Sequence, residues 1–404
     1  MFYDFISRAM NFYPLREWEG AYLMNILMVT TAFGIGGAET YILELSKELL
    51  RRGHSVTVAS SGGVYAEQLE EAGAVHVALP LSERSPIKLA RAYKGLKKLI
   101  EDHIQSGNPF DIVHAHARIC TIVCGKLKRS MPEAFHYVTT AHGVYKMLPG
   151  FSALTDWGER SLAVSEDVRK YLIDAYRISS DNITLTVNGI DAERFCPAPP
   201  DRKADIVRKL GLSDTCKHRV MHVSRLDLAS SDAAVQLIGS AEQLAELYPD
   251  IEIVTVGSGT EFDRLSDEAE QVNKKLGRKV IVMLGSRRDI PDILPCADVF
   301  VGVSRAALEA MSCGIPTVLA GAQGYLGIFD GEDSLKAAQK TNFCCRDGEK
   351  SSAEKLISDI KKLFDSDSEK LSRLGAFGRE TVKRLYSVSR MGDDAEAMYR
   401  ACMK

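Results

Sequence analysis

Short apolar runs rich in β-branched residues alternate with amphipathic segments along the chain from Met24 onward. In the first half, the runs that predict strands are 25–31, 55–60, 75–79, 111–116, 137–142, 161–165 and 183–188. Segments with helical periodicity, such as 39–52 and 87–104, lie between them. This alternation predicts a parallel sheet with helices on both faces, which is a doubly wound α/β domain.

The pattern breaks in the proline-rich stretch 196–201 and then starts again. Strands are predicted at 220–226, 251–257, 280–285, 298–303 and 317–320, with a further one near 342–345. We therefore expect an N-terminal extension over 1–23, a Rossmann-like domain over 24–198, and a second one over 199–385. A C-terminal helix over 386–404 is expected to pack back toward the first domain. Two such domains facing each other across a cleft place a ligand site at the carboxyl ends of both sheets.

Composition narrows the class of protein. The 404 residues fit two or three domains, and 45% hydrophobic with 26% charged residues is ordinary for a globular protein. A formal net charge of −3 gives no general attraction to nucleic acid. Nine scattered cysteines indicate reduced thiols and a cytoplasmic protein. No apolar run is long enough for a membrane span, and residues 1–23 lack the features of a signal peptide, although their aromatic residues also fit a short interfacial helix.

The segment 299–321 carries the most chemical information. An apolar strand stops at Ser304, a good N-cap residue, and a short helix containing Glu309 is closed by Gly314. The amino end of that helix offers free N–H groups to an anion at the carboxyl edge of the sheet. Glu309, one turn further on, is placed to accept hydrogen bonds from a sugar hydroxyl. The alternative is an ordinary strand–helix–strand unit whose glutamate faces water.

Glycines follow two of the predicted strands: Gly36, Gly37, Gly257 and Gly259. At a strand-to-helix turn, glycine lets the backbone approach a ligand closely, and the following helix start attracts phosphate. Neither turn completes the dinucleotide fingerprint, because Glu39 and Phe262 stand at the third glycine position. The Lys-Ser/Thr pair of a P-loop is also missing. These departures disfavour both a dehydrogenase and a P-loop nucleotidase.

Polar residues stand at the ends of three predicted strands: His142, Asn188 and Arg225. His114 and His116 share one strand face but have no evident third ligand, so a zinc site is not expected. A lone histidine such as His142 is also compatible with a purely structural role. For Arg225, an anion ligand and a surface ion pair both remain open.

Taken in order, seven short motifs resemble those of the family 4 glycosyltransferases, retaining enzymes of the GT-B architecture. They are Gly-Gly-Ala-Glu at 36–39, Asp-Ile-Val-His-Ala-His at 111–116, Thr-Ala-His-Gly at 140–143, Ala-Val-Ser-Glu at 163–166, Val-Asn-Gly-Ile-Asp at 187–191 with Phe195, Val-Ser-Arg-Leu at 223–226, and Leu-Glu-Ala-Met-Ser-Cys-Gly-Ile-Pro at 308–316. Each motif alone is weak evidence for the resemblance. Their order and spacing from Met24 onward are specific.

The resemblance implies transfer of a sugar from a nucleotide-diphosphate donor to a glycan or lipid-linked acceptor, with retention at the anomeric carbon. It implies no cofactor and no obligatory metal, and a place in cell-surface polysaccharide or glycolipid synthesis. By this resemblance Gly37 lies near the transferred sugar and diphosphate, and His142 contacts the sugar. Arg225 neutralises the leaving diphosphate, and Glu309 holds the ribose. The other expected donor-binding residues are Gly36, Gly257, Gly259, Ser304, Arg305 and Asn188.

The sequence departs from the family pattern at two positions. Ser230 and Ser231 occupy the place of a lysine that shares the diphosphate, and Val301 occupies the place of the first of two glutamates. Arg305, at the start of the helix, either replaces the lost cation or points to solvent. Weakened activity or a different donor would follow. Two other functions stay open: a non-catalytic nucleotide-sugar or glycan-binding partner protein, and a nucleotide-sugar epimerase.

A predicted helix over 84–98 is basic and contains no acidic residue after position 84. Its cations are Arg84, Lys88, Arg91, Lys94, Lys97 and Lys98. Such a helix suits docking on anionic lipid head groups near a lipid-linked acceptor. The alternative is a solvated face whose apolar stripe packs on the sheet.

Overall fold

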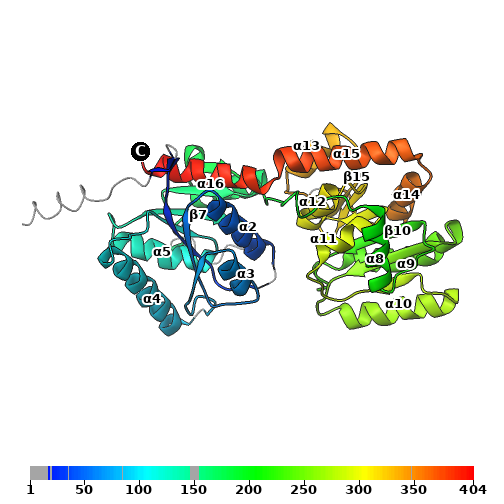
Figure 1. Cartoon of the computed structure of the whole chain (residues 1–404), viewed down its shortest axis with the longest axis horizontal. Helices are drawn as coiled ribbons and strands as arrows, with labels where there is room; N and C mark the ends of the chain where they lie inside the picture. Colours follow the sequence, from blue (N-terminus) through cyan, green and yellow to red (C-terminus); the bar gives the residue numbers. More distant parts are fainter. Residues whose placement is uncertain (1–16, 19–20, 35, 84, 146–153, 347) are drawn as a thin grey trace, which may run out of the picture. The chain divides into compact units, whose positions relative to one another are not determined.

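The computed structural model describes residues 17–18, 21–34, 36–83, 85–145, 154–346 and 348–404. Most of the expected extension over 1–23 therefore lies outside the described residues. The chain forms two compact units (Figure 1). Unit 1 contains the chain up to Val164, Val168–Thr186 and Gly392–Lys404, and unit 2 contains Ser165–Asp167 and Val187–Met391. The proline-rich stretch 196–201 lies within unit 2.

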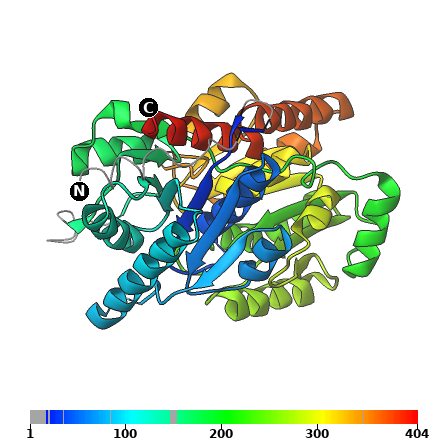
Figure 2. The ribbon, with the colours of Figure 1, turned by 60° about the vertical axis from the view of Figure 1, so that its left-hand side comes forward.

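In its described part, unit 1 has a seven-stranded sheet in the order β5-β4-β3-β6-β7-β8-β9, with every pair parallel. The strands are β3 (Asn25–Val29), β4 (Ser55–Ser60), β5 (Val75–Ala78), β6 (Ile112–Ala115), β7 (His136–Ala141), β8 (Arg160–Ala163) and β9 (Ile183–Leu185). A small antiparallel pair, β1 (Glu17–Trp18) and β2 (Ala21–Tyr22), precedes them. The arrows of β3 and β4 run side by side in Figure 2.

The helices of unit 1 connect these parallel strands (Figure 1). They are α2 (Gly37–Arg51), α3 (Tyr65–Glu71), α4 (Pro86–Gln105), α5 (Arg118–Ser130), α7 (Glu166–Tyr176) and the 3-10 turn η1 (Ser180–Asn182). Alternate residues of β3 and β6, such as Leu27 and Val113, pack with Leu96 and Ile100 of α4 in one buried cluster. The apolar stripe of α4 is therefore packed inward, which was one of its two interpretations.

In its described part, unit 2 has a six-stranded sheet in the order β12-β11-β10-β13-β14-β15. The strands are β10 (His218–Val223), β11 (Ile251–Val256), β12 (Ile281–Met283), β13 (Val299–Gly302), β14 (Thr317–Gly321) and β15 (Gly324–Ile328). All pairs are parallel except β14–β15, which is antiparallel at the edge. Successive residues of β10 show the two-sided burial, because Val220 belongs to one apolar cluster and Met221 to the other.

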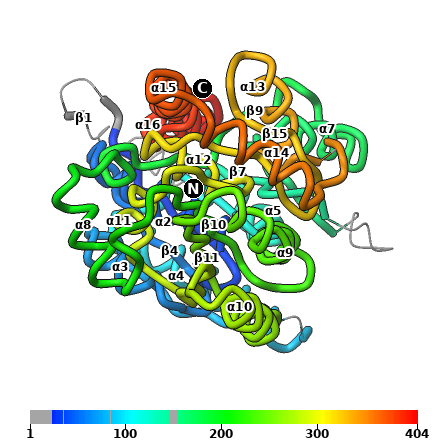
Figure 3. Tube along the Cα trace, turned by 90° about the vertical axis from the view of Figure 1, so that its right-hand side faces the viewer, coloured from blue at the N-terminus to red at the C-terminus, as the bar shows by residue number. Residues whose placement is uncertain are grey.

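Helices cover both faces of this sheet, as a doubly wound fold requires. They are α8 (Pro200–Lys209), α9 (Asp232–Leu247), α10 (Phe262–Leu276), α11 (Ile290–Ile293), the 3-10 turn η2 (Leu294–Cys296), α12 (Ser304–Ser312), α13 (Glu332–Gln339), α14 (Ala353–Phe364) and α15 (Ser368–Leu385). The last helix, α16 (Val388–Cys402), begins in unit 2, and its residues from Gly392 onward belong to unit 1. Leu237 of α9, Leu265 of α10 and Leu356 of α14 pack in one cluster, and Leu308 of α12 and Val382 of α15 pack in the other. Figure 3 shows α9 and α10 beside β10 and β11.

The predicted strands of both units are confirmed with one exception. The segment 342–345 is not a strand, because Asn342, Phe343 and Cys345 all have left-handed backbone angles, with φ of 52°, 60° and 59°. The final strand of the sheet is instead β15, which the sequence did not reveal. Among the described helices, none is long and apolar enough to cross a membrane.

Candidate functional site

The strand order of unit 2 reverses between β10 and β13, which are direct neighbours in the sheet. At such a switch point the two chain segments diverge beyond the carboxyl ends of the strands and leave a crevice that binds ligands in this class of fold. Arg225 follows β10, and Ser304 and Arg305 follow β13. The three residues thus lie at the same edge of the sheet, at its topological switch point.

The Arg225 side chain is exposed, and its guanidinium makes no ion pair or hydrogen bond with the residues that the structure describes. Its backbone is held firmly. The N–H of Leu226 donates to the carbonyl of Ser258 at 2.9 Å, and the hydroxyl of Ser230 donates to the carbonyl of Arg225 at 2.8 Å. Ser230, which stands where the family has a lysine, therefore closes the Arg225 loop. The result is an available cation on a fixed loop.

Gly257 and Gly259 pack against this same loop. A Cβ added at Gly257 would lie 1.8 Å from the carbonyl oxygen of Ser224, and the φ of Gly257 is 144°. A Cβ at Gly259 would lie 2.4 Å from the carbonyl carbon of Leu226. Both glycines are thus required for the close approach of two backbone segments. Their direct contact with a donor stays a prediction.

His222 connects the two strands at the switch point. Its Nδ1 lies 2.8 Å from the carbonyl oxygen of Val301, and its Nε2 lies 2.8 Å from the hydroxyl of Ser224. Because a carbonyl only accepts, Nδ1 carries the proton and Nε2 accepts from Ser224. Burial lowers the pKa of His222, which favours this neutral form. Val301, the residue in place of the family's first glutamate, is itself buried in β13.

Arg305 and Glu309 form an ion pair along α12. The Nε of Arg305 donates to Oε1 of Glu309 at 2.8 Å, and its Nη1 donates to the carbonyl of Gly189 at 3.1 Å. The two side chains are only 14% and 12% exposed. Arg305 therefore does not point to solvent, and it holds the segment that includes Asn188 beside α12.

The start of α12 is strained. Ser304 has a φ of 56°, and its N–H donates to the carbonyl of Phe343 at 2.8 Å. A left-handed non-glycine residue costs of order 1–3 kcal/mol and is often found at functional sites. The expectation that Ser304 caps the helix was wrong: the N-cap is Val303, and Ser304 is the first helical residue. The Phe343 carbonyl that accepts the bond from Ser304 belongs to the left-handed turn 342–345, which therefore holds the first residue of α12 in place.

In unit 1 the strand order reverses between β3 and β6, and the glycine turn follows β3. Gly36 is the N-cap of α2, and Gly37 is its first residue. A Cβ built on Gly37 would meet nothing within 4 Å, so the amino end of α2 is open there. At Gly36 a Cβ would meet only the flexible carboxylate of Glu39, at 2.3 Å. The backbone at Gly37 is therefore exposed and leaves room for a ligand.

His142 follows β7 at the same edge of unit 1. Its Nε2 lies 3.3 Å from Nδ1 of His116, and its ring meets the ring of Tyr41 edge-on at 4.9 Å between centroids. Burial lowers the pKa of His142 to about 4, and it also holds the pKa of His116 well below its usual value. Both rings are therefore neutral at pH 7. Neutral imidazoles donate and accept hydrogen bonds but supply no cation.

The predicted site residues thus fall into two sets. Arg225, Ser304, Arg305, Glu309 and the segment at Asn188 gather on unit 2, while Gly36, Gly37 and His142 gather on unit 1. Sequence reasoning missed His222, which contacts Ser224 beside Arg225, and Tyr41, whose ring contacts that of His142. A histidine inside the apolar run of β10 was the available signal for His222. Among the described residues, no group of three or more His, Cys, Asp or Glu side chains is placed to hold a metal ion.

Two family models match the chain: Glycosyltransferase Family 4 over residues 35–194 and Glycosyl transferases group 1 over residues 205–381. A UDP-Gal:alpha-D-GlcNAc-diphosphoundecaprenol alpha-1,3-galactosyltransferase of Escherichia coli is 30% identical over 58% of this chain and 62% of that protein. A GDP-mannose-dependent monoacylated alpha-(1-6)-phosphatidylinositol monomannoside mannosyltransferase of Corynebacterium glutamicum is 28% identical over 67% of this chain and 71% of that protein.

Solved structures of other proteins share this fold. A glycosyltransferase from Rickettsia africae superposes with a TM-score of 0.75 at 19% identity, covering 95% of this chain and 99% of that chain. Anabaena HepE in complex with UDP superposes with a TM-score of 0.71 at 16% identity, covering 94% of this chain and 100% of that chain. Together the two family models span most of the sequence, and the fold is that of these enzymes. The chain therefore belongs to the family 4 glycosyltransferases and has the GT-B fold.

Proposed function

We propose that this protein transfers a sugar from a nucleotide-diphosphate sugar to a glycan or lipid-linked acceptor, with retention of anomeric configuration. It needs no cofactor and no obligatory metal ion. The observation that carries the proposal is the exposed Arg225 guanidinium, on a fixed loop at the switch point of unit 2. Arg225 follows β10, and Glu309 lies in α12, which follows the neighbouring strand β13.

The leaving group explains why that cation matters. As the glycosidic bond breaks, negative charge develops on the diphosphate, so a fixed cation stabilises the transition state more than the ground state. Hydrogen bonds to a charged group contribute about 1.5–3 kcal/mol. Because Arg225 has no ion pair to break within the described residues, its full charge is available to the phosphates.

Glu309 is the proposed ligand of the ribose hydroxyls. A carboxylate accepts two hydrogen bonds from a vicinal diol, and Arg305 fixes its orientation through the 2.8 Å pair. The proposed role of Arg305 is therefore to hold the Glu309 carboxylate in place, and this role requires no contact between Arg305 and the diphosphate. The amino end of α12 follows β13 at the same switch point. Because the N–H of Ser304 is bonded to Phe343, the backbone N–H groups after Ser304 are the ones proposed to meet the phosphates.

On unit 1, Gly37 and His142 are proposed to contact the transferred sugar. The open amino end of α2 leaves room for it, and neutral His142 offers a hydrogen bond to a hydroxyl. The depressed pKa excludes a cationic His142 at pH 7, so its part is orientation of the sugar, not charge neutralisation.

The acceptor class is inferred from relatives and from α4. The two relatives above are named for a diphosphoundecaprenol and a phosphatidylinositol substrate. Because the apolar stripe of α4 packs inward, its cations Arg91 and Lys94 are exposed, while Lys97 and Lys98 pair with Glu101 and Asp102 at 3.6 and 3.4 Å. We therefore place the reaction in the cytoplasm, at an anionic membrane face and in surface polysaccharide or glycolipid synthesis. Arg84 lies outside the described residues.

The test is a donor and acceptor panel. The protein is incubated with UDP-, GDP- and ADP-sugars, alone and with polyprenyl-diphosphate sugars or phosphatidylinositol, and release of nucleoside diphosphate is measured. A transferase releases diphosphate with at least one pair, and proton NMR of the product must show the donor's anomeric configuration. Donor binding without turnover in every combination would instead indicate a binding protein. Interconversion of donor sugars would indicate an epimerase.

A further inference from the structure

Three histidines of unit 1 lie in line at the carboxyl edge of its sheet. His114 is in β6, His116 follows that strand by one residue, and His142 follows β7. The rings of His114 and His116 lie 4.0 Å apart at 34°, and His116 contacts His142 through the 3.3 Å nitrogen pair. His114 and His116 are fully buried, while His142 is partly exposed. The line thus runs from the interior to the proposed sugar site.

The inner end of this line meets the C-terminal helix. The hydroxyl of Tyr399 in α16 lies 2.7 Å from Nδ1 of His114, and the hydroxyl of Thr140 lies 2.7 Å from Nε2. Both nitrogens of His114 are therefore bonded, and its ring is fixed. Tyr399 itself is fully buried, so its position depends on the position and register of α16.

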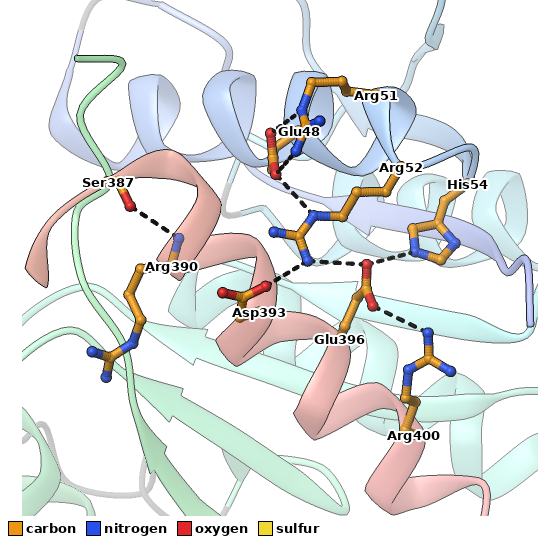
Figure 4. A network of polar contacts seen from close by, with 9 residues as sticks. All are labelled: Glu48, Arg51, Arg52, His54, Ser387, Arg390, Asp393, Glu396 and Arg400. Atoms are coloured by element: carbon orange, nitrogen blue, oxygen red, sulfur yellow. Dashed lines mark hydrogen bonds and ion pairs between the residues drawn. The ribbon is translucent and has the colours of Figure 1, made fainter. Parts of the chain in front are cut away.

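Charged residues anchor this part of α16 in unit 1 (Figure 4). Arg52 donates to Asp393 at 2.8 Å and to Glu396 at 3.3 Å. Glu396 also contacts Nε2 of His54 at 3.1 Å and accepts from Arg400 at 3.1 Å. A helix tied at two successive turns has a fixed register, and this register places Tyr399 beside His114.

The proton positions follow from the contacts. In the described part of the structure, Nε2 of His116 is buried and has no hydrogen-bond partner. A buried N–H without a partner is rarer and more costly than a buried lone pair without one, so the proton of His116 belongs on Nδ1. That N–H then donates to Nε2 of His142. His142, being neutral with an acceptor at Nε2, must carry its own proton on Nδ1.

We propose that Tyr399 is a positioning residue: it fixes the ring of His114, the ring of His116 packs against that ring at 4.0 Å, and His116 so positioned holds His142 in the tautomer protonated at Nδ1. His142 then presents one neutral N–H donor to a hydroxyl of the bound sugar. The identity of that ligand rests on the proposed function above, whereas the tautomer does not. The C-terminal helix thereby sets a hydrogen-bond donor in a site that it does not itself touch.

The experiment compares the full chain with Tyr399→Phe, using nitrogen-15-labelled histidine and two-bond proton–nitrogen NMR spectra at pH 7 without ligand. His142→Asn identifies the His142 signals. The wild-type protein should show His142 protonated at Nδ1, and Tyr399→Phe should shift it toward a mixture of tautomers. Thr140→Val removes the other bond to His114 without touching α16 and should give the same change. Tyr248→Phe, which deletes a buried hydroxyl of unit 2 that bonds Asp365 at 2.6 Å, should leave His142 unchanged.

Kinetics provide the second readout. Tyr399→Phe should lower kcat by about 2- to 10-fold with little change in KM for the donor, the range expected for loss of one oriented hydrogen bond. A wild-type His142 protonated at Nε2, or unchanged His142 spectra in both Tyr399→Phe and Thr140→Val, would overturn the proposal. If the tautomer shifts as expected but no donor is turned over, the proposed function fails while the positioning role stands.

Discussion

Replacing Gly257 with alanine tests whether the Arg225 loop is held by close backbone packing. The new Cβ would lie 1.8 Å from the carbonyl oxygen of Ser224, whereas unstrained nonbonded contacts lie at roughly 3.5 Å. The loop must therefore retreat by more than about 1.5 Å. The φ of 144° adds backbone strain of about 1–3 kcal/mol, and overpacking adds about 1–3 kcal/mol more. We expect a loss of about 2–6 kcal/mol in the free energy of unfolding of unit 2.

The assay is urea unfolding followed by circular dichroism, with hydrogen exchange of peptides from β10 and β11 to locate the change in unit 2. Gly239→Ala is the matched control, because Gly239 lies exposed in α9 and a Cβ there would meet nothing within 4 Å. That substitution should stabilise the protein by about 0.5–1 kcal/mol. Since Gly257→Ala also displaces Arg225, nucleoside diphosphate binding should weaken by about tenfold or more. Equal stability of the two variants with unaltered diphosphate binding would refute this account of the loop.

Two further predictions concern charge and protonation. Because burial lowers the pKa of His142 to about 4, the unfolded chain binds more protons below pH 6.5, so stability is complete above pH 6.5 and falls as the pH drops toward 4. His142 alone accounts for about 3 kcal/mol of that loss. Urea unfolding at pH 7.5 and pH 5 should therefore show a smaller change in the free energy of unfolding in His142→Asn than in the wild-type protein. An equal change in both proteins would contradict the prediction. Glu309→Gln should lower affinity for a ribonucleoside diphosphate about tenfold with little change for the 2′,3′-dideoxy analogue, measured by calorimetry, and equal losses for both would remove Glu309 from the ribose.

Local patterns in the sequence were sufficient for most strands and for the loops after them. The run 55–60 became β4 with the same bounds, because alternating β-branched residues leave few other options. The run 342–345 was misassigned because buried Phe343 and Cys345 resemble a strand, although their backbone is left-handed. Edge strand β15 was missed because Gly324 and Gly327 lower its strand propensity.

Within the site, the sequence named candidate residues but not the groups that they contact in the folded chain. The positions of Arg225 after one strand and of Glu309 on the helix after another were visible in the sequence, and the roles that the family resemblance implies for them stay predictions. The contact between Tyr399 and His114 joins residues 285 positions apart, and no local pattern marks it. The same holds for the bond from Arg305 to the carbonyl of Gly189. Such contacts depend on tertiary packing, which only the structure displays.

The most direct test of the central claim is a calorimetric comparison of nucleoside diphosphate and monophosphate binding to the wild-type protein and to Arg225→Ala. The base is the one that the donor panel selects. If Arg225 grips the pyrophosphate, the wild-type protein prefers the diphosphate by about 10- to 100-fold, and the variant loses most of that preference while keeping its fold. A variant that still prefers the diphosphate as strongly as the wild type would contradict the account.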